Sequence, residues 1–102
     1  VGRHFRISEE AKAIVGRDER ENSFLENYEV SRCAFKVLDF EGPLTLIEGE
    51  LSEEDRRKGA AITARYSDGK KQDVVRVKWW HGSESGVLDV LPIGDEIESL
   101  RI

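Results

Sequence analysis

Three side chains in this sequence are of the types that build a nucleophile and its base: one thiol, Cys33, and two imidazoles, His4 and His81. A thiol reacts as the thiolate, which an adjacent base or cation must stabilise. These residues lie in separate parts of the sequence, and none stands in a recognisable catalytic motif. A single cysteine in a strand-like run is usually a small buried apolar side chain. The sequence therefore predicts a non-catalytic domain.

Metal and cofactor sites are not predicted either. A single cysteine excludes an internal disulfide and a zinc site built from several thiolates, and the two histidines show no ligand spacing. Gly69-Lys70 lacks both the upstream glycine and the following Ser or Thr of a phosphate-binding loop. The carboxylates of residues 48–55 fit the preference of helix N-termini for negative charge. We expect no cofactor.

A binding site for RNA has more support in the residue pattern. The run that ends at Trp80 alternates in polarity, so Arg76, Lys78 and Trp80 share one strand face, and Lys70 and Lys71 precede it. Single-stranded RNA sites combine cations, which neutralise phosphate, with an exposed aromatic ring that stacks on a base. The same pattern also fits an outer strand in which Trp80 packs against a neighbour and both cations are merely solvated.

Charge is distributed unevenly along the chain. The net charge is -5, which on average argues against a nucleic-acid binder. Residues 39–55, however, hold seven acidic and no basic residues, whereas residues 65–80 hold five basic and two acidic residues. Such sorting can leave one basic face on an acidic molecule.

Hydrophobic periodicity and capping residues predict the elements that position these side chains. Alternation predicts strands over residues 3–7, 13–15, 34–38, 44–47, 74–80 and 87–91, and more weakly over 97–102. Asp18 with Glu21, and Ser52 with Asp55, have the spacing of capping boxes that start two helices. The prediction is an α+β domain, a largely antiparallel sheet with two helices packed on one side.

The size and composition fit one domain. A chain of 102 residues has room for one modest core. No run approaches the roughly 20 apolar residues of a membrane-spanning helix, no signal peptide is visible, and a single cysteine fits a reducing compartment. We therefore expect a cytoplasmic protein with no membrane partner.

The segment Ile14–Leu25 resembles the opening of the RNA-binding domain of the NFACT family (NFACT-R). The matching residues are Val15, Gly16, Arg17, Asn22 and Leu25, while Asp18 replaces the usual Asn. The later segment Ala60–Lys71 resembles that domain's helix, Tyr-Ser pair and basic turn, and Gly42-Pro43 falls at its loop between strands. Together these matches span most of the chain from residue 14 onward.

One family feature is missing, because the segment Lys36–Phe40 lacks the histidine that relatives carry before the Gly-Pro loop. That absence and the start Gly2–Arg6 look like a branch in which this domain follows a PP-loop ATPase similar to tRNA thiouridylases. A chain that starts at Val1 and contains no methionine fits a C-terminal piece of such a protein. We expect residues 1–102 to form a single NFACT-R-like domain of a longer chain.

The resemblance implies that RNA contacts lie at the matched polar positions. These are Arg17, Asn22, Arg65, Ser67, Lys70 and Lys71. Arg76, Lys78 and Trp80 join them from the strand-face argument alone.

Two hypotheses follow. The first is a non-catalytic RNA-binding module that holds RNA, expected to be tRNA, for a PP-loop ATPase domain of the same chain. The alternative is a protein-interaction or structural module that docks on its own catalytic domain or on a second copy. The acidic 39–55 stretch and the alanine-rich helix face would serve such a contact. Copurification with the ATPase part that resists nuclease would favour the alternative.

Overall fold

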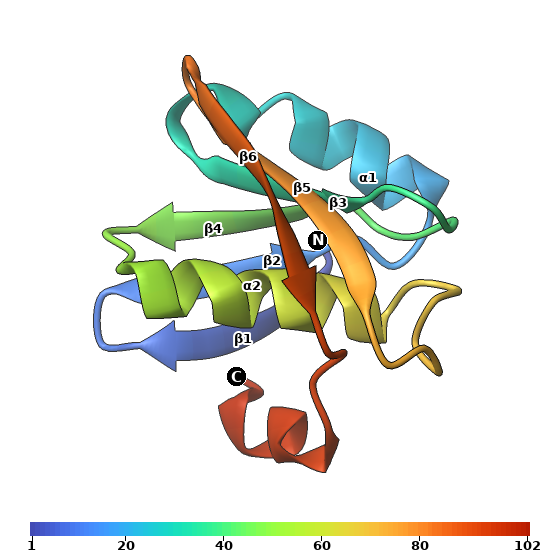
Figure 1. The fold of residues 1–102 in the computed structure, drawn as a ribbon. Coiled ribbons are helices and arrows are strands. Elements are labelled where there is room, and N and C mark those ends of the chain that lie inside the picture. The colour runs from blue at the N-terminus through green and yellow to red at the C-terminus, as the bar shows by residue number, and fades with distance from the viewer.

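The computed structural model describes residues 1–102 as six strands, two α-helices and two short 3₁₀ helices (Figure 1). The elements in chain order are β1 (Arg3–Ser8), β2 (Ala11–Val15), α1 (Glu19–Glu26), η1 (Glu29–Ser31), β3 (Cys33–Val37), β4 (Thr45–Gly49), α2 (Glu53–Arg65), β5 (Val75–His81), β6 (Glu84–Val90) and η2 (Asp95–Leu100).

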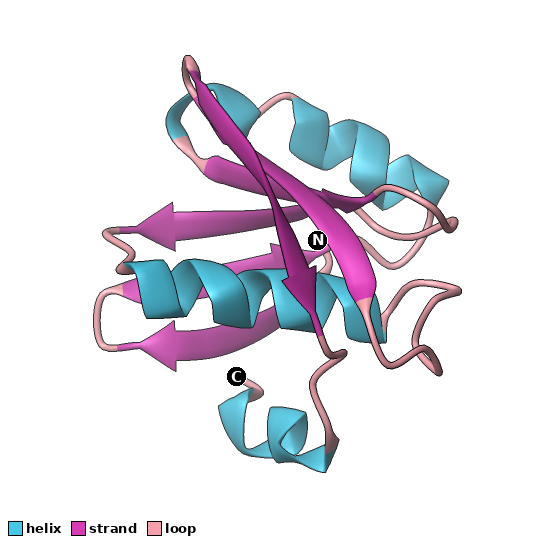
Figure 2. Cartoon of the chain, in the orientation of Figure 1, coloured by secondary structure: helices cyan, strands magenta, loops and turns pink.

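The six strands form one sheet in the order β1-β2-β4-β3-β5-β6, and every pair is antiparallel. Helix α2 crosses this sheet, and the long β5–β6 hairpin passes beside it (Figures 1 and 2). The predicted α+β class and antiparallel sheet are therefore confirmed.

One face of the sheet, here called the covered face, packs against α2. Alternate strand residues such as Phe5, Phe35 and Val77 point to this side and meet Ala60 and Ile62 of the helix in the main core cluster. All five are at most 1% exposed. Because alternate strand residues point to opposite faces, the intervening residues must lie on the other side of the sheet.

The opposite face, here called the open face, carries α1 over only part of its width. Leu25 of α1 packs with Ile14, Ala34, Leu44 and Leu46 in a separate, smaller cluster. The helices α1 and α2 therefore lie on opposite faces of the sheet, and the prediction that both pack on one side is wrong. The strands β2, β3 and β4 carry apolar residues at consecutive positions, which places an apolar surface on each face and requires cover on both.

The helix starts agree with the predicted capping residues. Ser52 and Asp55 form a full capping box at α2, and Asp18 caps α1 by accepting a hydrogen bond from the Glu21 N–H. The Glu21 carboxylate does not reach back to Asp18, because it accepts hydrogen bonds from Arg17 instead.

The C-terminal end differs from the prediction. Residues predicted as a weak strand form η2, and only Arg101 makes a strand-like bridge, to Phe5. The β5–β6 turn also comes earlier than predicted, at Gly82-Ser83, since His81 pairs with Glu84. Gly82 has φ +63°, a conformation that glycine adopts without steric cost in a two-residue hairpin turn. No helix of the structure is both long and apolar enough to cross a membrane.

Candidate nucleic-acid interface

The open face is uncovered at Lys36 of β3 and along much of β5 and β6, because α1 packs chiefly against β4. The strand register places Lys36 directly opposite Lys78, and Ala34 directly opposite Trp80. Side chains that are directly opposite in a sheet share a face. The uncovered strands therefore present two lysines and a tryptophan side by side.

Trp80 is the aromatic centre of this surface. Its ring is partly exposed and rests against the smaller core cluster that includes Leu44 and Leu46. The Lys78 ammonium lies 5.9 Å from the centroid of the Trp80 ring, within cation–π range. The Trp80 side chain thus packs on a neighbour and also keeps a free surface.

Lys36 was not among the predicted site residues. Its ammonium donates a hydrogen bond to the Gly42 carbonyl, at 3.2 Å, and the side chain is otherwise exposed. The sequence did indicate that Lys36 faces solvent, because it is the one charged residue in the strand-like run Ala34–Leu38. Only the pairing of β3 with β5, which joins residues far apart in the sequence, shows that it lies beside Lys78.

Arg76 also lies on the open face, but its charge is largely used within the protein. Its Nε and Nη2 atoms donate to the two Asp39 oxygens at 3.0 and 3.1 Å. These hydrogen bonds lower the pKa of Asp39 and raise that of Arg76. The pair ties the β3–β4 loop to β5, so Arg76 has less capacity for phosphate than the lysines.

Three loops meet at one end of the sheet: the β2–α1 turn (residues 16–18), the β3–β4 loop (residues 38–44) and the α2–β5 loop (residues 66–74). The Gly16 N–H donates to the Leu44 carbonyl at 3.0 Å, and the Asp68 N–H donates to the Glu41 carbonyl at 2.8 Å. A cavity of about 180 Å³ between the loops is lined by residues that include Arg3, Arg17 and Tyr66.

Arg17 stands exposed at this loop end in a two-point pair with Glu21. Its Nη2 lies 2.7 Å from Glu21 Oε2, and its Nε also donates to the carboxylate. These side-chain bonds, together with the Arg17 backbone N–H, lower the pKa of Glu21 to about 2. The Arg17 side chain is 55% exposed, but its charge, like that of Arg76, is largely used within the protein.

Asn22 acts as a fixed link between α1 and β4. Its Oδ1 accepts a hydrogen bond from the Leu44 N–H at 3.1 Å. Gly16 lies so close to this amide that a side chain there would collide with it. The family-matched Gly16 and Asn22 thus form one packing unit, whose immediate role is to hold the loop end together.

Lys70 and Lys71 are exposed in the α2–β5 loop, and neither side chain makes an ion pair or hydrogen bond within the protein. Their ammonium groups are therefore free to meet phosphate. The Lys70 N–H donates to the Ser67 carbonyl at 3.2 Å, which fixes the start of the loop.

Two predicted contact residues have other roles. Ser67 is 3% exposed, and its hydroxyl donates to the Ala64 carbonyl and accepts from the Gly69 N–H. It shapes the turn after α2 and is closed to a large ligand. Arg65 lies on the α2 side, where it donates to the Ile93 carbonyl at 3.0 Å and faces Asp95 at 3.6 Å. It anchors the C-terminal segment, away from the open face.

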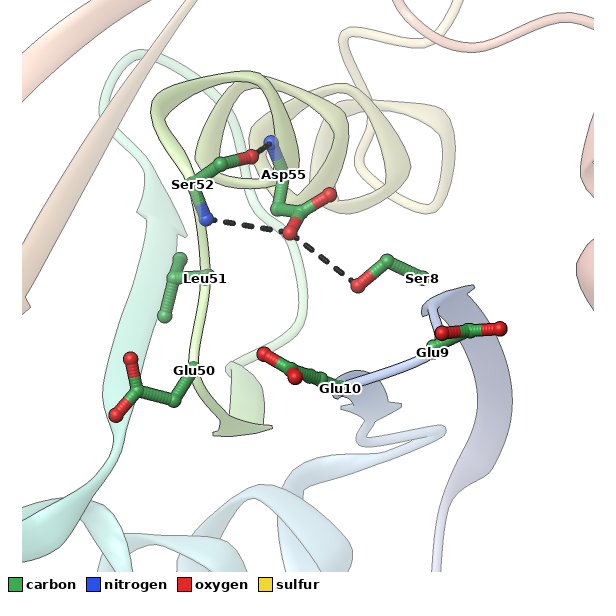
Figure 3. A pocket seen from close by; sticks show the side chains of 7 residues that line it. All are labelled: Ser8, Glu9, Glu10, Glu50, Leu51, Ser52 and Asp55. Atoms are coloured by element: carbon green, nitrogen blue, oxygen red, sulfur yellow. Dashed lines mark hydrogen bonds between the residues drawn. The ribbon is translucent and has the colours of Figure 1, made fainter.

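Another cavity, of about 530 Å³, lies near the β1–β2 turn and is strongly acidic (Figure 3). The side chains of Glu9, Glu10 and Glu50 surround it, and Asp55 binds both Ser8 and the Ser52 backbone N–H. These carboxylates would repel phosphate. No group of three or more His, Cys, Asp or Glu residues in the structure is arranged to hold a metal ion.

Cys33 is fully buried beneath α2, and burial raises the pKa of its thiol. Neither histidine lies within hydrogen-bond range of it, since His4 contacts the Val1 carbonyl and His81 makes no side-chain hydrogen bond. The structure thus does not assemble the thiol and the imidazoles into a nucleophilic site.

Comparison with known proteins gives both a fold and a family. The C-terminal part of the fibronectin/fibrinogen-binding protein from Streptococcus suis superposes with a TM-score of 0.84 at 17% sequence identity. The match covers 99% of this chain and 50% of that chain, and at this identity it shows a shared fold. No curated protein sequence matches the chain. The family model for the NFACT protein RNA-binding domain matches residues 2–99. The chain therefore belongs to the NFACT RNA-binding domain family.

Proposed function

We propose that this domain is a non-catalytic tRNA-binding module, appended to a PP-loop ATPase domain that modifies tRNA in the cytoplasm. Membership of an RNA-binding domain family over residues 2–99 is the observation that carries the RNA part. The start Gly2–Arg6 and the missing histidine in Lys36–Phe40 resemble the ATPase-linked branch, and this resemblance carries the tRNA part.

The surface chemistry supports binding of a single strand or loop. The bases of RNA become available for stacking where the strand is unpaired, and aromatic side chains on a sheet are the usual platform. Trp80 has a free ring surface beside Lys78 and Lys36 on the open face. We assign stacking to Trp80 and phosphate contact to the unpaired Lys78, Lys70 and Lys71, while Arg17 and Arg76, each paired with a carboxylate, contribute less.

The acidic net charge limits how strong this binding can be. Favourable RNA binding comes largely from phosphate neutralisation and release of counterions, and the molecule as a whole carries -5. The free cations lie on the open face and at the loop end, while the acidic cavity lies near the β1–β2 turn. We expect micromolar affinity that falls steeply with salt.

The test is fluorescence anisotropy of labelled tRNA between 50 and 200 mM salt, with charge reversal at the free lysines. Lys70→Glu with Lys71→Glu should weaken binding at least roughly fivefold and flatten the salt dependence. The matched control is Arg57→Glu with Lys58→Glu on α2, which changes net charge equally on the other side of the sheet. Circular dichroism checks that both variants fold.

Equal losses in the two variants would contradict a local RNA site, because net charge alone would then explain them. Binding of unrelated RNA as tight as tRNA would contradict the tRNA assignment alone. Absence of RNA binding at 50 mM salt, with nuclease-resistant binding to the ATPase part, would favour the docking function.

A further inference from the structure

A cavity of about 370 Å³ opens beside Trp80, between the end of α1 and the open face. Its lining residues are Asn22, Glu26, Glu29, Lys36, Leu44 and Trp80. This volume falls in the range of small-ligand sites, roughly 300–1,000 Å³. The cavity adjoins the surface to which the proposed function assigns stacking, so a base on the bound strand can reach it.

The cavity combines apolar walls with free hydrogen-bonding groups. Trp80 and Leu44 belong to the smaller core cluster and give it a rigid apolar side. The carboxylates of Glu26 and Glu29 make no hydrogen bond or ion pair with the rest of the protein. Lys36 uses one donor for the Gly42 carbonyl, which leaves two of the three ammonium protons free.

Two carboxylates in the cavity decide which part of the RNA enters. A phosphate would meet two like charges and is repelled, whereas a nucleobase is neutral. The unpaired cations Lys78, Lys70 and Lys71 lie outside the cavity lining. The charges thus favour a base inside the cavity, with the phosphates of the strand outside on the lysines.

The donor and acceptor pattern selects among the bases. An ionised carboxylate only accepts hydrogen bonds, so Glu26 and Glu29 require a base with several donors. The Watson–Crick edge of guanine presents two adjacent donor groups, N1–H and N2–H₂, while adenine, cytosine and uracil each present only one. Guanine also offers O6 and N7 as acceptors, which lysine commonly contacts.

We infer that this cavity binds one unpaired guanine of the RNA, with Glu26 and Glu29 accepting from its Watson–Crick edge, Lys36 donating to O6 or N7, and Trp80 stacking on the ring. This inference rests on the proposed function and makes it more specific. In this arrangement the acidic residues Glu26 and Glu29 determine which base is preferred, while the lysines of the same surface supply the affinity for RNA.

The experiment measures binding of short labelled oligouridylates that carry guanosine, adenosine, cytidine or inosine at one central position. The guanosine strand should bind at least about fivefold tighter than the adenosine and cytidine strands, since a good two-point base contact discriminates by this factor or more. Inosine lacks the N2 amino group and should lose part of the preference.

The deciding variant is Glu26→Ala with Glu29→Ala. It removes two negative charges and both acceptor groups, so affinity for plain oligouridylate should stay equal or rise, while the preference for guanosine falls below about twofold. The matched control is Glu9→Ala with Glu10→Ala at the exposed β1–β2 turn, which changes net charge equally. That control should keep the preference.

Each result separates this inference from the proposed function. Binding of all strands with equal affinity, or a guanosine preference that survives in Glu26→Ala with Glu29→Ala, overturns the guanine site and leaves RNA binding intact. Failure of the wild-type domain to bind any strand at low salt overturns both.

Discussion

The two faces of the sheet are built from the same strands yet differ in how completely they are covered. On the covered face, α2 spans the strands and encloses side chains such as Phe35 and Val77 completely. On the open face, α1 closes only the part around Leu25 and Leu46, and the strands beyond it stay bare. Trp79 and Trp80, adjacent in sequence, fall on different faces and meet different surroundings.

This difference separates stability from binding. A fully enclosed apolar face lowers the free energy of the folded state through burial, and it has no surface left for a ligand. A partly covered face contributes less to stability, but it offers a flat, rigid surface on which cations and an aromatic ring are held by the strands. Binding residues on such a surface can be changed without loss of the main core.

The largest expected effect is on the covered face. Phe35→Ala removes a fully buried ring and should lower the free energy of unfolding by about 3–5 kcal/mol, measured by urea denaturation. Phe24→Ala makes the same change at a half-exposed side chain of α1, on the open-face side. It should lower the free energy of unfolding by at most about 1 kcal/mol. Similar losses in the two variants would refute the contrast between the faces.

The second effect concerns the adjacent tryptophans. Trp80→Ala should weaken tRNA binding roughly 5- to 150-fold, the factor that corresponds to about 1–3 kcal/mol of base stacking. Trp79→Ala removes a ring that lies under the Arg56 guanidinium at 4.3 Å on the covered face. It should lower Tm and leave the RNA affinity of the folded protein unchanged, as anisotropy below the melting range would report.

A third, smaller effect tests whether α2 matters for binding at all. Ser52→Ala removes the helix cap and should lower stability by about 1 kcal/mol, or roughly 4–8 °C in Tm. Ser23→Ala, at an exposed position of α1 without a side-chain hydrogen bond, is the control and should not lower Tm. Changed RNA affinity in the folded Ser52→Ala protein would mean that the two faces are coupled.

The smallest effect is the pH dependence of the Arg17–Glu21 pair. The pKa of Glu21 is lowered to about 2, below the ordinary value of 4.5, so the carboxylate stabilises the folded state above pH 4.5. This contribution disappears as the pH falls toward 2. Glu21→Gln should lower Tm by roughly 1–3 °C at neutral pH, and the difference from wild type should close near pH 2.

Thermal melts of both proteins across pH 2–7 measure this difference. A gap that stays constant down to pH 2 would contradict the depressed pKa. Glu19→Gln, at an exposed first-turn position that forms no ion pair, serves as the comparison and should not reproduce the Tm gap of Glu21→Gln.

The sequence predicted most strands because their signals are local. The alternation in residues 74–80, for example, follows from the period of a strand. The observed strand β5 is shifted by one residue, to Val75–His81. The capping residues Asp18 and Ser52 likewise mark helix starts through hydrogen bonds to the next turn. The strand predicted over residues 97–102 was wrong, because its weak alternation is not supported by strand pairing. The chain forms the 3₁₀ helix η2 there.

Only part of the candidate site could be predicted from the sequence. Lys78 and Trp80 were placed on one face by the strand period, and the structure brings Lys36 beside them through the β3–β5 pairing. Ser67 and Arg65 matched family positions, but the structure turns them inward or toward the C-terminal segment. A matched residue type does not reveal whether its hydrogen bonds are already used within the protein.

The amino-acid sequence by itself determined the α+β class, the helix caps, the strand faces and the family resemblance, because each depends on residues close together along the chain. Only the tertiary structure decided which sheet face each helix covers, which cations remain unpaired and where the cavity beside Trp80 lies. These features depend on strand order and on contacts such as Arg76 with Asp39 and Asn22 with Leu44, which join residues that the local pattern cannot relate.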